Sequence, residues 1–186
     1  MSIFNNYPHI YYNNIKARNI MLEGELVKNT LLDYNRFFKY TIKNYERPDI
    51  LAYKQYNDSS LDWVLMLINN VVDPYKDWIM DDAQLTAHLS YKYGTTTSVA
   101  LNPEQIQNII LHYYYKGLPS DTEQQINSYN YKMTPGTYSK LGNPAGWAPV
   151  YAWDYEVELN ESKREINVLR SNYVLDFVQQ YKELFN

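Results

Sequence analysis

The chain has 186 residues, a formal net charge of −4 and no cysteine. The absence of cysteine excludes disulfides, thiolate metal sites and cysteine nucleophiles, and it fits a reducing compartment. The acidic balance provides no basic footprint, so we expect neither nucleic-acid binding nor a polybasic contact with a membrane. The 21 tyrosines leave two interpretations open, a surface rich in protein–protein contacts or compositional drift.

No targeting or membrane segment is predicted. The first residues lack a charged segment followed by an apolar run, so no signal peptide is expected. The longest apolar run, residues 64–68, is far shorter than the roughly 20 residues that a membrane-spanning helix needs. Residues 1–36 show no long period and are predicted to form an N-terminal arm.

A small strand–helix–helix–strand unit is predicted for residues 37–80. Residues 38–43 alternate aromatic and β-branched side chains and favour a strand. A turn then leads, through Pro48, into a short helix that ends at Tyr56. A second helix carries its apolar stripe on Leu61, Val64, Leu65 and Ile68, and asparagines 69 and 70 close it. Residues 77–80 are predicted to form a short second strand.

Residues 81–116 are predicted to be a helical extension. One helix fits Asp82–Lys92, with Leu85 and Leu89 on one face. Residues 95–101 have strand propensity. A further helix opens at Pro103, follows the apolar face of Ile106, Ile109, Ile110 and Tyr113, and stops at Gly117.

The last third of the chain divides into two parts. Residues 117–150 hold most of the glycine and proline and are predicted to form a long irregular loop or arm. Residues 151–159 alternate apolar and polar side chains, which predicts a strand that turns at residues 160–163 and pairs with 165–170 as a β-hairpin. Ser171 then begins a C-terminal helix. The alternative is one helix over residues 154–184.

The run YTIKNYERPDILAYKQYNDSSLDWVLMLINNVVDP resembles a LysM module, a βααβ fold that often binds N-acetylglucosamine polymers. The matching positions are Tyr40, Thr41, Ile42, Ala52, Tyr56, Asn69, Asp73 and Pro74. The usual glycine before the last strand is missing, and Asp77 and Trp78 stand there instead. The resemblance implies an α+β fold with a LysM-like core over residues 37–80.

A longer resemblance is to the baseplate wedge proteins of contractile-tailed, T-even-like bacteriophages. It is carried by ERPD, LDWVL, DPY and the C-terminal YEVELNESKREINVL, and it covers about residues 37–80 and 151–185. It implies a virion structural protein of the tail baseplate that assembles in the host cytoplasm. Such a subunit is present in multiple copies, binds several other wedge proteins and helps join wedges into a ring around the tail tube.

No catalytic, cofactor or metal site is predicted. His9, His88 and His112 are far apart, and no paired His–carboxylate spacing, nucleophile elbow or phosphate loop occurs. Glu156 and Glu158 are interpreted as a solvated face. We therefore predict that the chain is not an enzyme and needs no cofactor.

The functional candidates are contacts to partner proteins. We predict such contacts at Asp73, Pro74, Tyr75, Trp78 and Trp147, and at Glu161, Lys163 and Arg164, the charged tip of the predicted hairpin. The alternative is glycan binding between the loops of residues 44–49 and 70–75. Trp63 is predicted to be a core residue.

Overall fold

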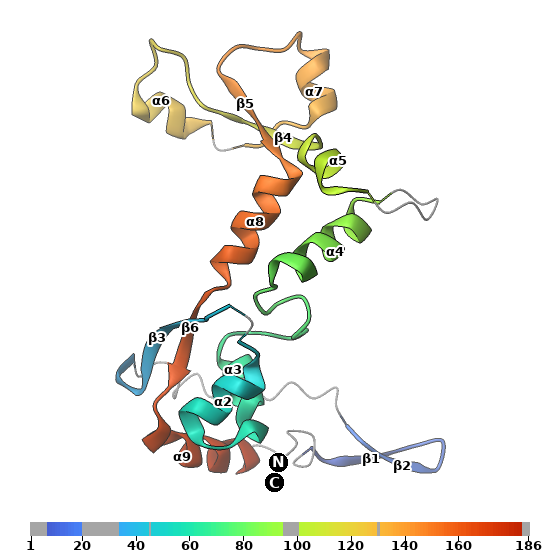
Figure 1. The fold of residues 1–186 in the computed structure, drawn as a ribbon, viewed down its shortest axis with the longest axis vertical. Helices are drawn as coiled ribbons and strands as arrows, with labels where there is room; N and C mark the ends of the chain where they lie inside the picture. Colours follow the sequence, from blue (N-terminus) through green and yellow to red (C-terminus); the bar gives the residue numbers. More distant parts are fainter. Residues whose placement is uncertain (1–6, 20–33, 45, 95–100, 130, 184–186) are drawn as a thin grey trace. The chain divides into compact units, whose positions relative to one another are not determined.

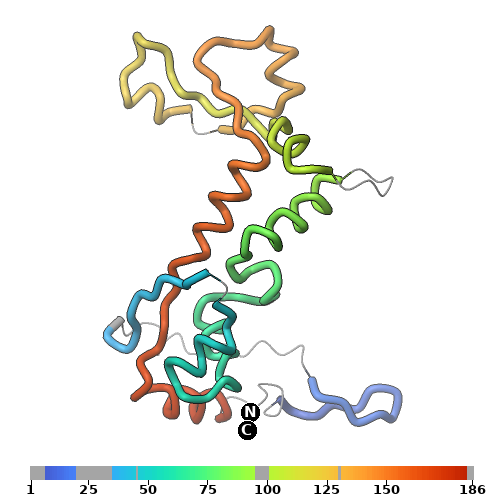
Figure 2. Tube along the Cα trace, in the orientation of Figure 1, coloured from blue at the N-terminus to red at the C-terminus, as the bar shows by residue number. Residues whose placement is uncertain are grey.

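A computed structural model describes residues 7–19, 34–44, 46–94, 101–129 and 131–183. The chain divides into unit 1, Met1–Ile79 with Lys163–Asn186, and unit 2, Met80–Ser162. It leaves unit 1 after residue 79 and returns to it at residue 163 (Figure 2). Helices and strands both contribute to the fold, so the prediction of an α+β class is confirmed.

The central sheet of unit 1 joins strands that lie far apart in the sequence (Figure 1). β3 (Phe37–Thr41) pairs antiparallel with β6 (Glu165–Leu169), with Phe37 opposite Leu169. The predicted β3 is therefore confirmed, but its partner is not residues 77–80, which form no strand. Unit 1 contains a strand, two helices and a second strand in that order, but the second strand is β6. The LysM resemblance stays a prediction.

The two helices that follow β3 begin and end where the sequence predicts. α2 (Pro48–Tyr56) starts at its proline and ends at Asn57, which adopts the left-handed conformation at φ 57°. A 3₁₀ turn, η3 (Ser59–Leu61), leads into α3 (Asp62–Ile68). Asp58 caps that turn by accepting a hydrogen bond from the backbone N–H of Ser60 at 2.9 Å.

Helix α3 lies between two apolar clusters of unit 1. One contains Val64, Trp63 and residues of α9 (Ser171–Glu183), where the rings of Trp63 and Tyr181 are 4.8 Å apart. The other places Leu65 against α2, β6 and Trp78. Trp63 is 6% exposed, which confirms it as a core residue. The C-terminal helix begins at Ser171 as predicted.

The N-terminal arm contains an unpredicted β-hairpin. β1 (His9–Tyr12) pairs with β2 (Ile15–Arg18), and a 3₁₀ turn, η2 (Tyr34–Arg36), precedes β3. Asn13 and Asn14 connect the strands with φ values of 48° and 60°, the conformation that a tight primed turn requires. The prediction of irregular structure is wrong for this segment, and residues 20–33 lie outside the described residues.

In unit 2, the predicted helix α4 (Asp82–Lys92) is confirmed, and it begins with a capping box between Asp81 and Gln84. α5 (Pro103–Gln107) begins at the predicted proline but ends ten residues before the predicted stop at Gly117. The segment after it forms β4 (Ile110–Tyr115), which pairs with β5 (Trp147–Tyr151). Its β-branched and aromatic residues suit a strand once a partner strand is available.

The segment 117–150 is more regular than predicted. It contains α6 (Glu123–Ser128), α7 (Pro135–Lys140) and the start of β5. Thr122 and Thr134 cap the two helices through their hydroxyl groups. Helices of six residues are too short to show a hydrophobic period. Most of the strand predicted at 95–101 lies outside the described residues.

The predicted C-terminal hairpin is wrong. Residues 152–162 form α8 (Ala152–Ser162), and β6 pairs with β3 rather than with residues 151–159. Ala152, Glu156 and Asn160 make the buried stripe of α8 at helical spacing. Two of these three residues are polar, which hid the helical period. The alternative of a helix beginning at residue 154 is closer to the structure, although β6 interrupts it.

Candidate interaction surfaces

The loop of residues 72–75 exposes large apolar side chains on a fixed backbone. Val72 is 88% exposed and Tyr75 is 86% exposed. The Asp77 carboxylate accepts hydrogen bonds from the backbone N–H groups of Val72 at 3.0 Å and Asp73 at 2.8 Å. These bonds lower the pKa of Asp77, so its carboxylate stays ionised and holds the loop at neutral pH.

Asp73 and Pro74, two of the predicted contacts, belong to the same loop. Asp73 accepts a hydrogen bond from the backbone N–H of Tyr75 at 3.0 Å and forms an ion pair with Lys76 at 3.3 Å. Pro74 is exposed. Asp73 therefore shapes the turn that presents Tyr75, and we call residues 72–75 the Tyr75 loop.

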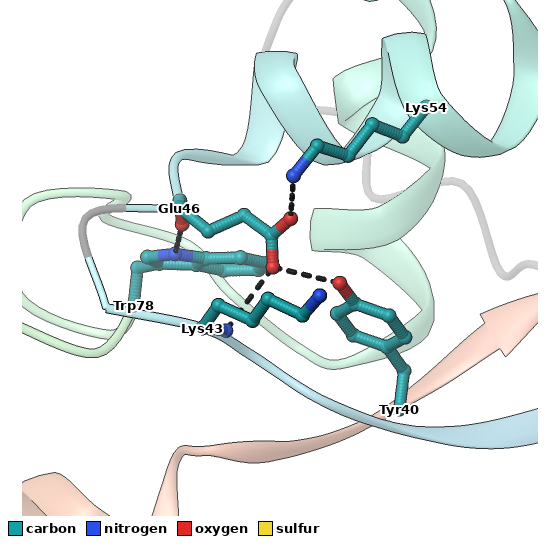
Figure 3. A network of polar contacts seen from close by, with 5 residues as sticks. All are labelled: Tyr40, Lys43, Glu46, Lys54 and Trp78. Atoms are coloured by element: carbon teal, nitrogen blue, oxygen red, sulfur yellow. Dashed lines mark hydrogen bonds and ion pairs between the residues drawn. The ribbon is translucent and has the colours of Figure 1, made fainter.

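Trp78 is not a surface residue. Its side chain is 5% exposed and packs in the core of unit 1 with Leu51 and Val168. Its indole Nε1–H donates a hydrogen bond to the backbone carbonyl of Glu46 at 2.9 Å (Figure 3). The burial of Trp78 fixes the segment that follows the Tyr75 loop to the turn before α2. Trp78 therefore supports the loop, and the prediction that it contacts a partner directly is corrected.

Beside Trp78 lies a buried carboxylate, Glu46, which anchors the turn before α2 (Figure 3). Burial raises its pKa, but hydrogen bonds from Lys54 at 2.6 Å, the Lys43 backbone N–H at 3.1 Å and Tyr40 at 2.9 Å outweigh burial and lower it. Burial and the bond to Glu46 raise the pKa of Tyr40 to about 12. Tyr40, the Lys43 backbone and Lys54 all donate to this carboxylate, so it is ionised and structural at neutral pH.

The charged residues predicted at a hairpin tip have different positions. Glu161 is exposed in the last turn of α8. Lys163 donates to the Lys76 carbonyl at 2.5 Å, and one guanidinium nitrogen of Arg164 donates to the Ile42 carbonyl at 3.1 Å. Lys163 and Arg164 therefore hold the chain where it re-enters unit 1.

Trp147 lies in an aromatic cluster in unit 2. Its ring centroid is 5.1 Å from that of Tyr131, 5.5 Å from Tyr115 and 6.5 Å from Tyr129. Tyr129 is 45% exposed and Tyr131 is 52% exposed. We call these four residues the Trp147 cluster; it forms a partly exposed aromatic surface of the type that is enriched at interfaces.

Hydrogen bonding stabilises the Trp147 cluster at Tyr115. The Tyr115 hydroxyl donates to the Asp121 carboxylate at 2.5 Å, and this bond raises the pKa of Tyr115 to about 12. Tyr115, Tyr129 and Tyr131 are not among the contacts predicted from the sequence. Their close spacing around Trp147 depends on β4 pairing with β5, with Tyr115 opposite Trp147.

The described residues contain no group of three or more His, Asp or Glu side chains that could hold a metal ion. Among the described helices, none has the length and apolar character needed to cross a membrane.

Comparison with known proteins places the whole chain in one family. The family described as "Base plate wedge protein 53" matches residues 2–184. The baseplate wedge protein gp53 of Enterobacteria phage T4 is 26% identical over 159 residues, which are 81% of this chain and 74% of that protein. Both matches support a structural role in the baseplate wedge. The chain therefore belongs to the baseplate wedge protein 53 family and is a structural subunit of a bacteriophage tail baseplate, where it assembles with other baseplate components.

Proposed function

We propose that this subunit binds several neighbouring wedge proteins and helps join wedges into a ring around the tail tube. It is present in multiple copies per virion, and it assembles in the host cytoplasm. It acts by burial of aromatic and apolar surface rather than by catalysis, in agreement with the structural description of its family.

The Tyr75 loop is the observation that carries this proposal. Tyr75 and Val72 expose 86% and 88% of their surface on a backbone held by Asp77 and Asp73. Interface hot spots are enriched in tyrosine, and a backbone that is already ordered loses little entropy on binding. An exposed aromatic residue on a fixed loop is therefore well suited to anchor a partner.

The Trp147 cluster supports a second contact. Tyr129 and Tyr131 are about half exposed beside Trp147, so an incoming partner would complete the burial of rings that are already packed together. Glu161 suits a contact at the rim of an interface, where charge mainly sets encounter rate and register.

The test is co-expression of the tagged chain with the other wedge proteins of the same phage, followed by native mass spectrometry. The variant Tyr75→Ser should weaken the resulting complex at least tenfold, because a central aromatic anchor contributes more than about 1.4 kcal/mol. Tyr91→Ser is the matched control, since Tyr91 is 88% exposed on α4, outside the loop.

Equal loss of binding in both variants would show that general surface hydrophobicity, not the Tyr75 loop, holds the complex. A wild-type chain that stays alone beside soluble, folded wedge proteins would overturn the proposed function itself.

A further inference from the structure

The β1–β2 hairpin has two chemically different faces. Tyr12 lies opposite Ile15, and Ile10 lies opposite Ala17. Because side chains alternate along a strand, these four residues share one face, and it is entirely apolar. The other face carries the pairs His9–Arg18 and Tyr11–Lys16. The hairpin is thus a ribbon with an apolar face and a cationic face.

The apolar face is exposed in the isolated chain. Tyr12 is 70% exposed, Ile15 is 69% exposed and Ile10 is 40% exposed. Among the described strands, none extends this two-stranded sheet. An isolated two-stranded hairpin is marginally stable in water, and a strand pattern with one apolar face specifies a buried face. These residues are therefore arranged for a surface that the described part of the chain does not supply.

The base of the hairpin is fixed to unit 1. The Tyr7 hydroxyl lies 3.1 Å from that of Tyr181 on α9, and Tyr7 packs against the core cluster there. The backbone N–H of Asn19 donates to the Pro8 carbonyl at 2.8 Å and closes the ribbon at its base. The hairpin therefore starts from a defined point, which lowers the entropy lost when a partner binds it.

The size of the apolar face argues against a second copy of the chain as its partner. One tyrosine, two isoleucines and one alanine provide roughly 400 Å² on this face, about half of the ~800 Å² per partner in a stable interface. A partner that encloses both faces would bury about twice that area. Lys16 is exposed on the other face. The partner surface opposite Lys16 would need carboxylates to complement the lysine charge.

We propose that the β1–β2 hairpin inserts into a groove of a different baseplate wedge protein, with one apolar wall against Tyr12 and Ile15 and one acidic wall against Lys16. This inference rests on the proposed wedge-joining function and identifies one surface that performs it.

The test uses the full-length chain and a complex of the remaining wedge proteins purified without it. Kd is measured by interferometry for the wild type and for the double variant Tyr12→Thr with Ile15→Thr, which keeps strand propensity but removes apolar area. The expected result is at least a hundredfold weaker binding, about tenfold for each residue. The matched control, Ile50→Thr with Tyr53→Thr, removes an exposed isoleucine and tyrosine from α2 and should bind as the wild type.

The acidic wall is tested separately with Lys16→Glu. This variant should lower the association rate several-fold at low salt, and the difference should shrink as salt rises. Lys140→Glu, an exposed lysine on α7, controls for the change of net charge. Hydrogen exchange of residues 9–18 in the wild type should slow when the wedge complex is added.

Distinct outcomes separate the two proposals. If both hairpin variants bind the wedge complex as tightly as the wild type does, the proposed insertion into a groove is wrong and the proposed wedge function stands. No binding of the wild type would overturn the wedge function. Self-association lost only in the double variant would identify a second copy as the partner. Co-sedimentation of the wild type, but not the double variant, with phosphatidylserine vesicles would identify a membrane; either result would overturn the groove.

Discussion

The side-chain amide of Asn69 is hydrogen bonded to both backbone polar groups of Asn167, 98 positions away in the sequence. Its Nδ2 donates to the Asn167 carbonyl at 2.9 Å, and its Oδ1 accepts from the Asn167 N–H at 2.8 Å. The same Nδ2 donates to the Leu65 carbonyl at 2.8 Å. Asn69 thus joins the end of α3 to β6 and satisfies backbone groups on a strand edge that β3 does not pair.

Replacing Asn69 with alanine should destabilise unit 1 by about 1–3 kcal/mol, because the backbone N–H and carbonyl of Asn167 lose their side-chain partner in a part-buried position. The Leu65 carbonyl keeps the bond from the backbone N–H of residue 69 at 3.3 Å. Denaturant unfolding followed by tryptophan fluorescence measures the change, since Trp63 and Trp78 lie in the core of unit 1. Asn172→Ala, on the exposed surface of α9, is the control and should stay within about 0.5 kcal/mol. Equal effects would contradict the role of Asn69.

Replacing Glu46 with glutamine should cost about 1–3 kcal/mol at neutral pH, because the ion pair with Lys54 is lost at a buried position. Glu165→Gln is the control: its pair with Lys39 is 3.0 Å long, but both side chains are more than 60% exposed, so its loss should cost less than about 1 kcal/mol. The free energy of unfolding of both variants is measured in parallel. A larger cost for Glu165→Gln would refute the stabilising role of the Glu46–Lys54 ion pair.

The wild type should also lose stability in acid through Glu46. The carboxyl pKa is lower in the folded chain than its ordinary value of 4.5, so the unfolded chain binds the proton first. The stabilisation is fully present above pH 4.5 and disappears as pH falls through the lowered folded value. Between pH 7 and pH 3, the free energy of unfolding should therefore fall less in Glu46→Gln than in the wild type. An equal fall in both proteins would argue against an ionised, hydrogen-bonded Glu46.

Glu156 is the corresponding buried carboxylate of unit 2. Burial raises its pKa, but hydrogen bonds from Lys92 and Tyr93, both at 2.7 Å, outweigh burial and lower it. Glu156→Gln should reduce the stability of unit 2 by about 1–3 kcal/mol. Glu158→Gln, exposed on the same helix, should change it by less than about 0.5 kcal/mol. A strand at this position would put both glutamates on one face and make the two variants similar.

Gly146 supports the Trp147 cluster. Its φ is +83°, and a Cβ there would lie 2.7 Å from the Tyr115 ring. Gly146→Ala should cost at least about 1–2 kcal/mol for the left-handed backbone, and it should shift the near-ultraviolet circular dichroism as Tyr115 moves. Gly136→Ala is the control, because a Cβ at Gly136 meets nothing within 4 Å. An unchanged aromatic spectrum in Gly146→Ala would show that the cluster tolerates the added methyl group.

The sequence alone determined the elements whose signals are local. Capping residues, prolines at helix starts and apolar stripes located α2, α3, α4 and the start of α9. These signals depend on spacings of a few residues, which a sequence displays directly. The order of short motifs also identified the baseplate wedge family, which the match over residues 2–184 confirms.

Tertiary structure decided which distant segments meet. Strand β6 pairs with β3 rather than with its sequence neighbour, and α8 buries the polar residues Glu156 and Asn160 instead of an apolar stripe. Asn160 is bonded twice to the backbone of Met80 at 2.9 Å, as Asn69 is to Asn167. Both asparagines have the character of turn residues in the sequence, because nothing local reveals a backbone partner 80 or 98 positions away. The Trp147 cluster depends on strand pairing in the same way, so only the folded chain brings its rings together.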